Sequence, residues 1–146
     1  MSEETPTPPD RGPIDTELLD RIAAHLARSD RFNEIQTRPK YAPNAVIAEY
    51  NLGFFPGGVT RACLRIRWFE TDDFSIHYSE QYRTTNSWDC RWDCHPNEHN
   101  TREHFHPPPD APTPGTDENY PDEWRAVLTI VLTQLDERIK AFWEEY

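Results

Sequence analysis

Residues 59–95, VTRACLRIRWFETDDFSIHYSEQYRTTNSWDCRWDCH, decide the fold. β-branched and aromatic residues alternate there with polar ones, and a period of two is typical of strands with one buried face. Two polar clusters, Thr71-Asp72-Asp73 and Thr84-Thr85-Asn86, interrupt the alternation where loops are expected. The stretch therefore predicts three consecutive strands of an antiparallel meander, at about 59 to 70, 73 to 83 and 86 to 95.

The meander is expected to extend toward the amino terminus by one more strand. Residues 45 to 54 have the same extended pattern, and Pro56-Gly57-Gly58 is a turn signal ahead of the next strand. A short strand between residues 31 and 41 is only weakly indicated, because Pro39 and Pro43 cannot donate to a backbone ladder. The expected sheet thus has about four strands.

Two helices are expected to flank this sheet in the sequence. Asp15 or Thr16 can cap a first helix, whose apolar side chains are Leu18, Leu19, Ile22, Ala23 and Leu26. Pro121 opens a longer helix, and one apolar face is formed by Trp124, Val127, Leu128, Val131, Leu135, Ile139 and Phe142. We therefore expect a single α+β domain over residues 14 to 146, with an N-terminal helix, an antiparallel meander sheet and a long C-terminal helix packed on one face. The proline-rich residues 1 to 13 are expected to form a disordered tail.

The charge of the chain is strongly negative. Its 26 acidic residues face 15 basic ones, a net charge of -11, and only Lys40 and Lys140 are lysines. An acidic, lysine-poor surface is typical of proteins from salt-accumulating cells, where salt screens its self-repulsion, although an ordinary acidic protein is the alternative. Long-range attraction to nucleic acid is excluded in either case. A polyanion would have to bind at a local arginine cluster.

The location follows from what the sequence lacks. No segment approaches the ~18 apolar residues of a membrane span, and the first residues have neither the basic nor the apolar region of a secretory signal. A cytoplasmic protein without membrane contact is therefore expected. Its odd set of three cysteines, Cys63, Cys90 and Cys94, argues against a disulfide framework.

Strand alternation assigns polar side chains to one face of the expected sheet, here called the open face. The residues assigned to it are Arg61, Cys63, Arg65 and Arg67, then His77, Ser79, Gln81 and Arg83, and finally Asp89, Arg91, Asp93 and His95. The opposite, core face receives Trp88, Cys90, Trp92 and Cys94 from the last strand. A solvated surface with cross-strand ion pairs would explain the open face without any function.

A histidine-rich segment after the last strand favours a function. The sequence HPNEHNTREHFHPPP, residues 95–109, adds His99, His104 and His106 beyond Asp93 and His95. In an extended backbone, His104 and His106 point the same way and Phe105 packs opposite. Arginine, aspartate and histidines on one face are the side chains of a phosphoryl-transfer or metal site.

At RWDCHP, residues 91–96, and EHFHPP, residues 103–108, the chain resembles the TumE-type toxin family of prokaryotic toxin-antitoxin systems. The family pattern is an Arg-x-Asp strand end, a nearby His and a His-rich stretch ahead of a C-terminal helix. The matching positions are Arg91, Asp93, His95, His104 and His106. Cys94 stands where the family often has Asn, and the likeness runs over roughly residues 59 to 140. The resemblance implies a toxin, of a haloarchaeal-like kind given its composition, that an antitoxin protein neutralises and whose target is RNA.

The first hypothesis for the chemistry is a metal-independent ribonuclease without a cofactor. His104 and His106 would form the acid/base pair, with Asp93 orienting one ring, His95 nearby and Arg91 at the phosphate. The sequence does not decide which histidine is acid and which is base. Further substrate contacts are expected from Arg61, Arg65, Arg67, His77 and Arg83.

Two alternatives remain open from the sequence. Asp93, His95, His104 and His106 could instead bind a divalent metal such as zinc, whereas Cys90, Cys94 and His95 lack the paired spacing of a strong zinc motif. The chain could also be a non-enzymatic interaction module, with a tryptophan as its anchor. A homodimer is compatible with each hypothesis.

Overall fold

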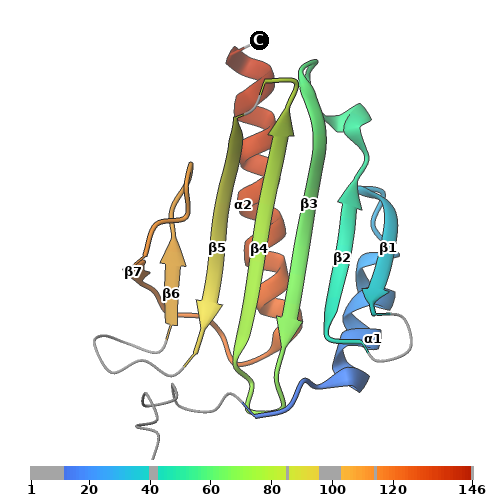
Figure 1. Ribbon diagram of the computed structural model, residues 1–146, viewed down its shortest axis with the longest axis vertical. Coiled ribbons are helices and arrows are strands. Elements are labelled where there is room, and N and C mark those ends of the chain that lie inside the picture. Colours follow the sequence, from blue (N-terminus) through green and yellow to red (C-terminus); the bar gives the residue numbers. More distant parts are fainter. Residues whose placement is uncertain (1–11, 40–42, 85, 96–102, 114, 146) are drawn as a thin grey trace, which may run out of the picture.

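A computed structural model describes residues 12–39, 43–84, 86–95, 103–113 and 115–145. Most of the expected disordered tail, residues 1–11, lies outside the described residues, as does His99. Seven strands form one sheet, in which each strand pairs with its neighbours in the chain (Figure 1). They are β1 (Phe32–Arg38), β2 (Ala45–Tyr50), β3 (Val59–Trp68), β4 (Phe74–Tyr82), β5 (Ser87–Cys94), β6 (Glu103–His106) and β7 (Thr116–Asp117).

The antiparallel meander is confirmed, but the prediction of about four strands is wrong. β1 forms because Pro39 follows its last residue and so removes no hydrogen bond from the ladder. β6 and β7 lie in the segment that was predicted to be a connection between the sheet and the C-terminal helix. These two strands have only four and two residues, too few to show a periodic pattern in the sequence.

Two helices pack on the sheet. α1 (Thr16–Leu26) is a short helix of 11 residues, and Asp15 caps it by accepting a hydrogen bond from the Leu18 amide at 3.0 Å. α2 (Trp124–Glu145) has 22 residues and runs along the sheet behind β3, β4 and β5 (Figure 1). A short 3-10 helix, η1 (Leu52–Phe54), follows β2. No described helix has the length and apolar character needed to span a bilayer.

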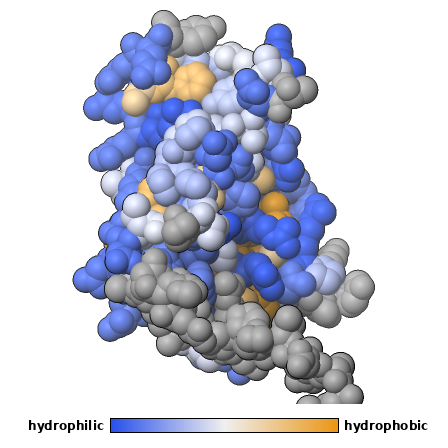
Figure 2. Space-filling model, turned by 60° about the vertical axis from the view of Figure 1, so that its left-hand side comes forward, coloured by the Kyte–Doolittle hydropathy of each residue, from blue (hydrophilic) through white to orange (hydrophobic). Residues whose placement is uncertain are grey.

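The core lies between one face of the sheet and the helices. β3, β4 and β5 contribute the buried side chains Leu64, Ile66, Trp68, Ile76, Tyr78, Cys90 and Trp92. α2 contributes Val127, Leu128, Val131, Leu132 and Leu135, and its Gln134 accepts a hydrogen bond from the Trp92 indole at 3.0 Å. Hydrophilic residues dominate the outer surface on the β6 and β7 side (Figure 2). The core and open faces of β3 to β5 are therefore those that the alternation predicted.

Candidate active site on the open face

The register of the sheet lines up the predicted site residues in two rows across the open face. Asp93 of β5 lies between Ser75 of β4 and His104 of β6, and Ser75 in turn pairs with Arg67 of β3. The next row consists of Arg65, His77, Arg91 and His106. Neighbouring strands lie about 4.8 Å apart, so each row places side chains from four strands close together.

The centre of the site is the Asp93 carboxylate, which is only 2% exposed. Its Oδ2 accepts a hydrogen bond from Arg91 Nε at 2.7 Å and lies 3.1 Å from His106 Nε2 and 3.9 Å from His95 Nε2. Its Oδ1 is buried and has no hydrogen-bond partner among the described residues. We call Arg91, Asp93, His95 and His106 the Asp93 network. A buried carboxylate needs compensating charge, which Arg91 supplies at one oxygen.

His106 has one nitrogen with a fixed role and one that can exchange a proton. Its Nδ1 lies 2.8 Å from the carbonyl oxygen of Pro112, which can only accept, so Nδ1 carries a hydrogen. Its Nε2 lies 3.2 Å from Arg91 Nη2 and 3.1 Å from Asp93 Oδ2. A neutral ring accepts from Arg91 there, whereas a protonated ring donates to Asp93. Proton exchange at His106 is therefore confined to Nε2.

His104 is the most deeply buried histidine of the site, with an exposure of 1%. Its ring lies 5.2 Å from that of His95 and 6.3 Å from that of His106, measured between centroids. Burial lowers the pKa of His104 below its usual value, and the neighbouring His95 and His106 lower it further, against opposing effects of Asp117 and Asp93. These surroundings favour the neutral imidazole at His104.

The loop between β6 and β7 covers His106. It supplies the Pro112 carbonyl, and its Pro109 carbonyl accepts a hydrogen bond from the Asp89 amide at 2.7 Å. Gly115 lets the returning chain approach closely, because a Cβ atom there would lie 2.6 Å from the Phe105 carbonyl oxygen and 3.1 Å from His106 Cε1. Sequence reasoning missed the roles of Pro112 and Gly115. A lone glycine ahead of the final helix was the only available signal.

The solvent edge of the network consists of Arg91 and His95, whose side chains are 32% and 22% exposed. Beyond them on the open face, Arg65 is exposed, and His77 pairs with Asp89 at 3.0 Å between Nε2 and Oδ1. The Arg67 guanidinium lies 5.4 Å from the Phe69 ring centroid. The structure thus places Arg65, Arg67 and His77 in the same two rows as the network.

Two predicted substrate contacts lie elsewhere. Arg61 pairs with Gln81, toward the far end of β3, and its Nε donates to Glu49 Oε1 at 2.8 Å. Arg83 follows the last residue of β4, eight residues from Ser75, which corresponds to roughly 26 Å along an extended chain. The strand alternation assigned Arg61 to the open face, and its pairing with Gln81 agrees with that assignment, whereas Arg83 lies outside the strand. The alternation carried no information on how far along the sheet the two arginines lie from Asp93.

The sequence left open a metal site at Asp93, His95, His104 and His106. No group of three or more histidine, cysteine, aspartate or glutamate side chains among the described residues is arranged to hold a metal ion. Cys90 lies in the core, and Cys94 is half-buried against it, so both thiols belong to the face opposite Asp93. Burial raises the pKa of Cys90 to about 12.

Fold and site together define a small α+β protein with a charged, histidine-containing site on one face of an antiparallel sheet. A sequence profile of the family described as Toxin TumE matches residues 18–139. The chain belongs to this toxin family. The match includes all seven strands and all of α1 except its first two residues, although the sequence resemblance left this helix uncovered. Neither the curated proteins nor the solved structures include a significant match.

Proposed function

We propose that this toxin cleaves RNA without a metal ion, at the Asp93 network. The observation that supports this function is the convergence of Arg91, His95 and His106 on one oxygen of the buried Asp93 carboxylate. Imidazole groups transfer protons near neutral pH, and guanidinium binds phosphate. As a toxin of a toxin-antitoxin pair, the protein would be neutralised by an antitoxin protein.

The proposed reaction uses two histidines and one arginine. His95 takes the proton from the ribose 2′-hydroxyl, and the 2′-oxygen forms a bond to phosphorus. The bond between phosphorus and the 5′-oxygen breaks as His106 donates its Nε2 proton to that leaving oxygen. Arg91 stabilises the negative charge of the phosphorane. In the free protein His106 Nε2 lies 3.2 Å from Arg91 Nη2 and 3.1 Å from Asp93 Oδ2, so binding of the phosphate to Arg91 must also draw the His106 ring away from Asp93.

The accessibility of His95 supports its assignment in place of His104, which the sequence paired with His106. A proton-transfer group must come within hydrogen-bond reach of the substrate. The His95 side chain is 22% exposed at the solvent edge, whereas His104 is fully buried. We therefore propose His104 as a positioning residue that supports Asp93 and His95. Arg65, Arg67 and His77 would contact the flanking RNA backbone.

Expression and cleavage assays test the proposal. Induction of the wild-type protein alone should arrest growth, and the purified protein should cleave RNA in the presence of EDTA. His95→Ala and His106→Ala should each lower the cleavage rate by ~10²–10⁴-fold. The matched control is His25→Ala, because His25 packs edge-on against Trp124 on the helix side of the sheet.

Three outcomes would count against the proposal. Cleavage that returns only on addition of a divalent cation would favour the metal hypothesis. Undiminished toxicity of a folded His95→Ala, His106→Ala double variant would exclude the network as the catalytic site. Toxicity without any RNA cleavage would show that the toxin does not act as a ribonuclease.

A further inference from the structure

The large hydrophobic side chains that are exposed in the described residues are neighbours on the surface. They are Leu52, Phe54 and Trp143, with exposures of 36%, 41% and 48%. Leu52 and Phe54 belong to η1, and the indole nitrogen of Trp143, near the end of α2, donates to the Phe54 carbonyl oxygen at 2.7 Å. We call these three side chains the apolar patch. Contiguous exposed apolar groups on a charged protein mark interaction sites.

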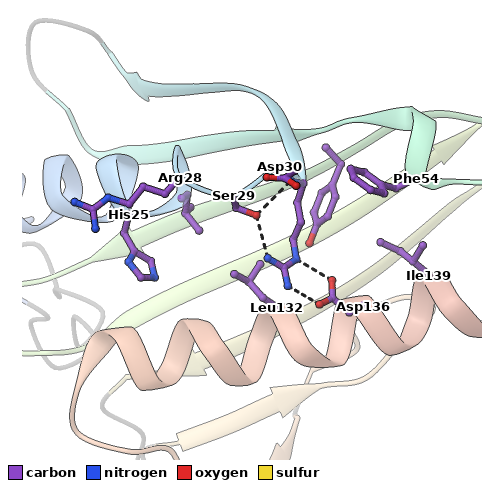
Figure 3. Close-up of a pocket in the computed structure, with 11 residues that line it drawn as sticks. His25, Arg28, Ser29, Asp30, Phe54, Leu132, Asp136 and Ile139 are labelled. Atoms are coloured by element: carbon purple, nitrogen blue, oxygen red, sulfur yellow. Dashed lines mark hydrogen bonds and ion pairs between the residues drawn. The ribbon is translucent and has the colours of Figure 1, made fainter.

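A cavity of about 600 Å³ adjoins the apolar patch. It lies between the C-terminal end of α1, η1 and α2 (Figure 3). Leu132 and Ile139 reach toward it from α2, and Phe54 belongs both to the cavity wall and to the apolar patch. Arg31 Nε donates to Asp136 Oδ1 at 2.8 Å, and both residues line the cavity as a charge-compensated pair. The patch and the cavity are therefore one continuous surface.

One polar atom in the cavity wall lacks a partner. Tyr50 is 3% exposed, lines the cavity, and its hydroxyl forms no hydrogen bond with any described residue. Burial and the nearby Asp136 raise the pKa of Tyr50, so its hydroxyl remains protonated and can donate a hydrogen bond. A buried donor without an acceptor is rare in proteins. An occupant of the cavity would therefore bring a hydrogen-bond acceptor.

We propose that the apolar patch and the cavity dock a segment of the antitoxin, a proposal that rests on the function proposed above. The segment would insert an apolar side chain into the cavity, present a carbonyl or hydroxyl oxygen to Tyr50, and carry basic residues around this anchor. The basic character follows from charge complementarity. Glu137, Glu144 and Glu145 outnumber Lys140 in the part of α2 around Trp143, and the whole chain has a net charge of -11.

The docking surface and the Asp93 network lie on opposite faces of the sheet. α2 covers the core face, whereas Asp93, His95 and His106 belong to the open face. The docked segment itself would thus leave the network uncontacted, and it would anchor the antitoxin while other parts of the antitoxin cover the open face. Substitutions on the docking surface should produce a toxin that still arrests growth but that its antitoxin no longer neutralises.

The test pairs the full-length toxin with the protein encoded beside it, measured by calorimetry and by rescue of growth. Phe54→Asp and Trp143→Asp should each weaken binding at least ~100-fold and abolish rescue while toxicity persists. Thr133→Asp is the matched control, because it adds the same charge at an exposed position of α2. Tyr50→Phe removes only the donor and should weaken binding ~5- to 10-fold without loss of thermal stability.

Binding affinity separates this proposal from the catalytic one, because it can be measured on a toxin without activity. If Phe54→Asp and Trp143→Asp bind the antitoxin like the wild type, the docking proposal is wrong even where RNA cleavage is confirmed. If light scattering instead shows a homodimer that Trp143→Asp dissociates, the occupant is a second copy and the proposal is overturned. Weakened binding by folded variants upholds it, whatever the cleavage assay shows.

Discussion

Arg138 of α2 and Glu80 of β4 form an ion pair, with 2.9 Å between Arg138 Nη2 and Glu80 Oε1, and the Glu80 side chain is fully buried. The Tyr78 and Tyr82 hydroxyls also donate to this carboxylate, and the guanidinium lies 3.9 Å from the Trp88 ring centroid. The C-terminal helix is thereby joined to the centre of the sheet by charge as well as by apolar packing.

Loss of Arg138 should be costly because it leaves the buried Glu80 without a cation. Arg138→Leu should lower the free energy of unfolding by about 3 kcal/mol or more, measured by urea denaturation. Combining it with Glu80→Gln should restore part of that loss, because the neutral amide needs no counter-charge. A single substitution that costs under ~1 kcal/mol would show that the pair is solvated.

The stability of the protein should fall on mild acidification because of His104. The folded state holds the pKa of His104 below its usual value of ~6.5, so the unfolded chain takes up the proton first as the pH falls. The free energy of unfolding should therefore decrease below about pH 6.5, by at most ~1.4 kcal/mol per pH unit from this group. His104→Gln should flatten that dependence in urea titrations at several pH values. If the pH dependence of the free energy of unfolding is unchanged in this variant, a group other than His104 causes it.

Gly115 should resist substitution because the Phe105 backbone is so close to it. Gly115→Ala would place a Cβ atom 2.6 Å from a carbonyl oxygen, so the loop must shift and its Pro112 contact with His106 should weaken. We expect a loss of ~1–3 kcal/mol in stability and a changed His106 Nδ1 signal in the NMR spectrum. Gly53→Ala is the control, because its nearest contact at 3.1 Å is the movable side chain of Asn51. Equal effects of the two substitutions would contradict the steric argument.

The acidic surface should make folding dependent on salt. A net charge of -11 on 146 residues repels itself at low ionic strength, and added salt screens this repulsion. Circular dichroism should show structure gained as KCl rises from low to multimolar concentration. Complete folding in dilute buffer would remove the support for an origin in a high-salt cell.

The cysteines should differ in reactivity. Cys90 is buried, and its pKa of about 12 leaves almost no thiolate at pH 8. A thiol reagent should therefore modify Cys90 only after unfolding, as mass spectrometry of the labelled peptides would show. Cys63 is half-buried and should react earlier. Rapid labelling of Cys90 in the folded protein would contradict its position in the core.

Much of the fold could be predicted from the sequence because side-chain alternation carries the information. Trp88, Cys90 and Trp92 alternate with charged residues, and this pattern correctly separated the core face from the open face of β5. The apolar spacing after Pro121 likewise predicted α2. β6 and β7 could not be predicted, since strands this short are stabilised by their pairing with β5 rather than by their own composition.

The residue types of the candidate site could be predicted from the sequence, but the burial of its side chains could not. Local sequence placed Asp93, His95, His104 and His106 together. The register of β5 and β6 brings His104 and His106 beside Asp93, and His95 Nε2 lies 3.9 Å from Asp93 Oδ2. The burial of His104 and His106 depends on tertiary contacts, including the return of the chain at Gly115, which no periodic pattern encodes. The exclusion of Arg83 from the neighbourhood of Asp93 depends in the same way on the strand register.

The order of the elements along the chain has a consequence during synthesis. Every strand pairs with its sequence neighbours, so the sheet can assemble progressively as the polypeptide emerges from the ribosome. α2, which covers the apolar face of β3 to β5, follows all seven strands. The apolar inner surface of the sheet therefore stays exposed until α2 has been synthesised. In that interval chaperones or an antitoxin can capture the chain before it matures.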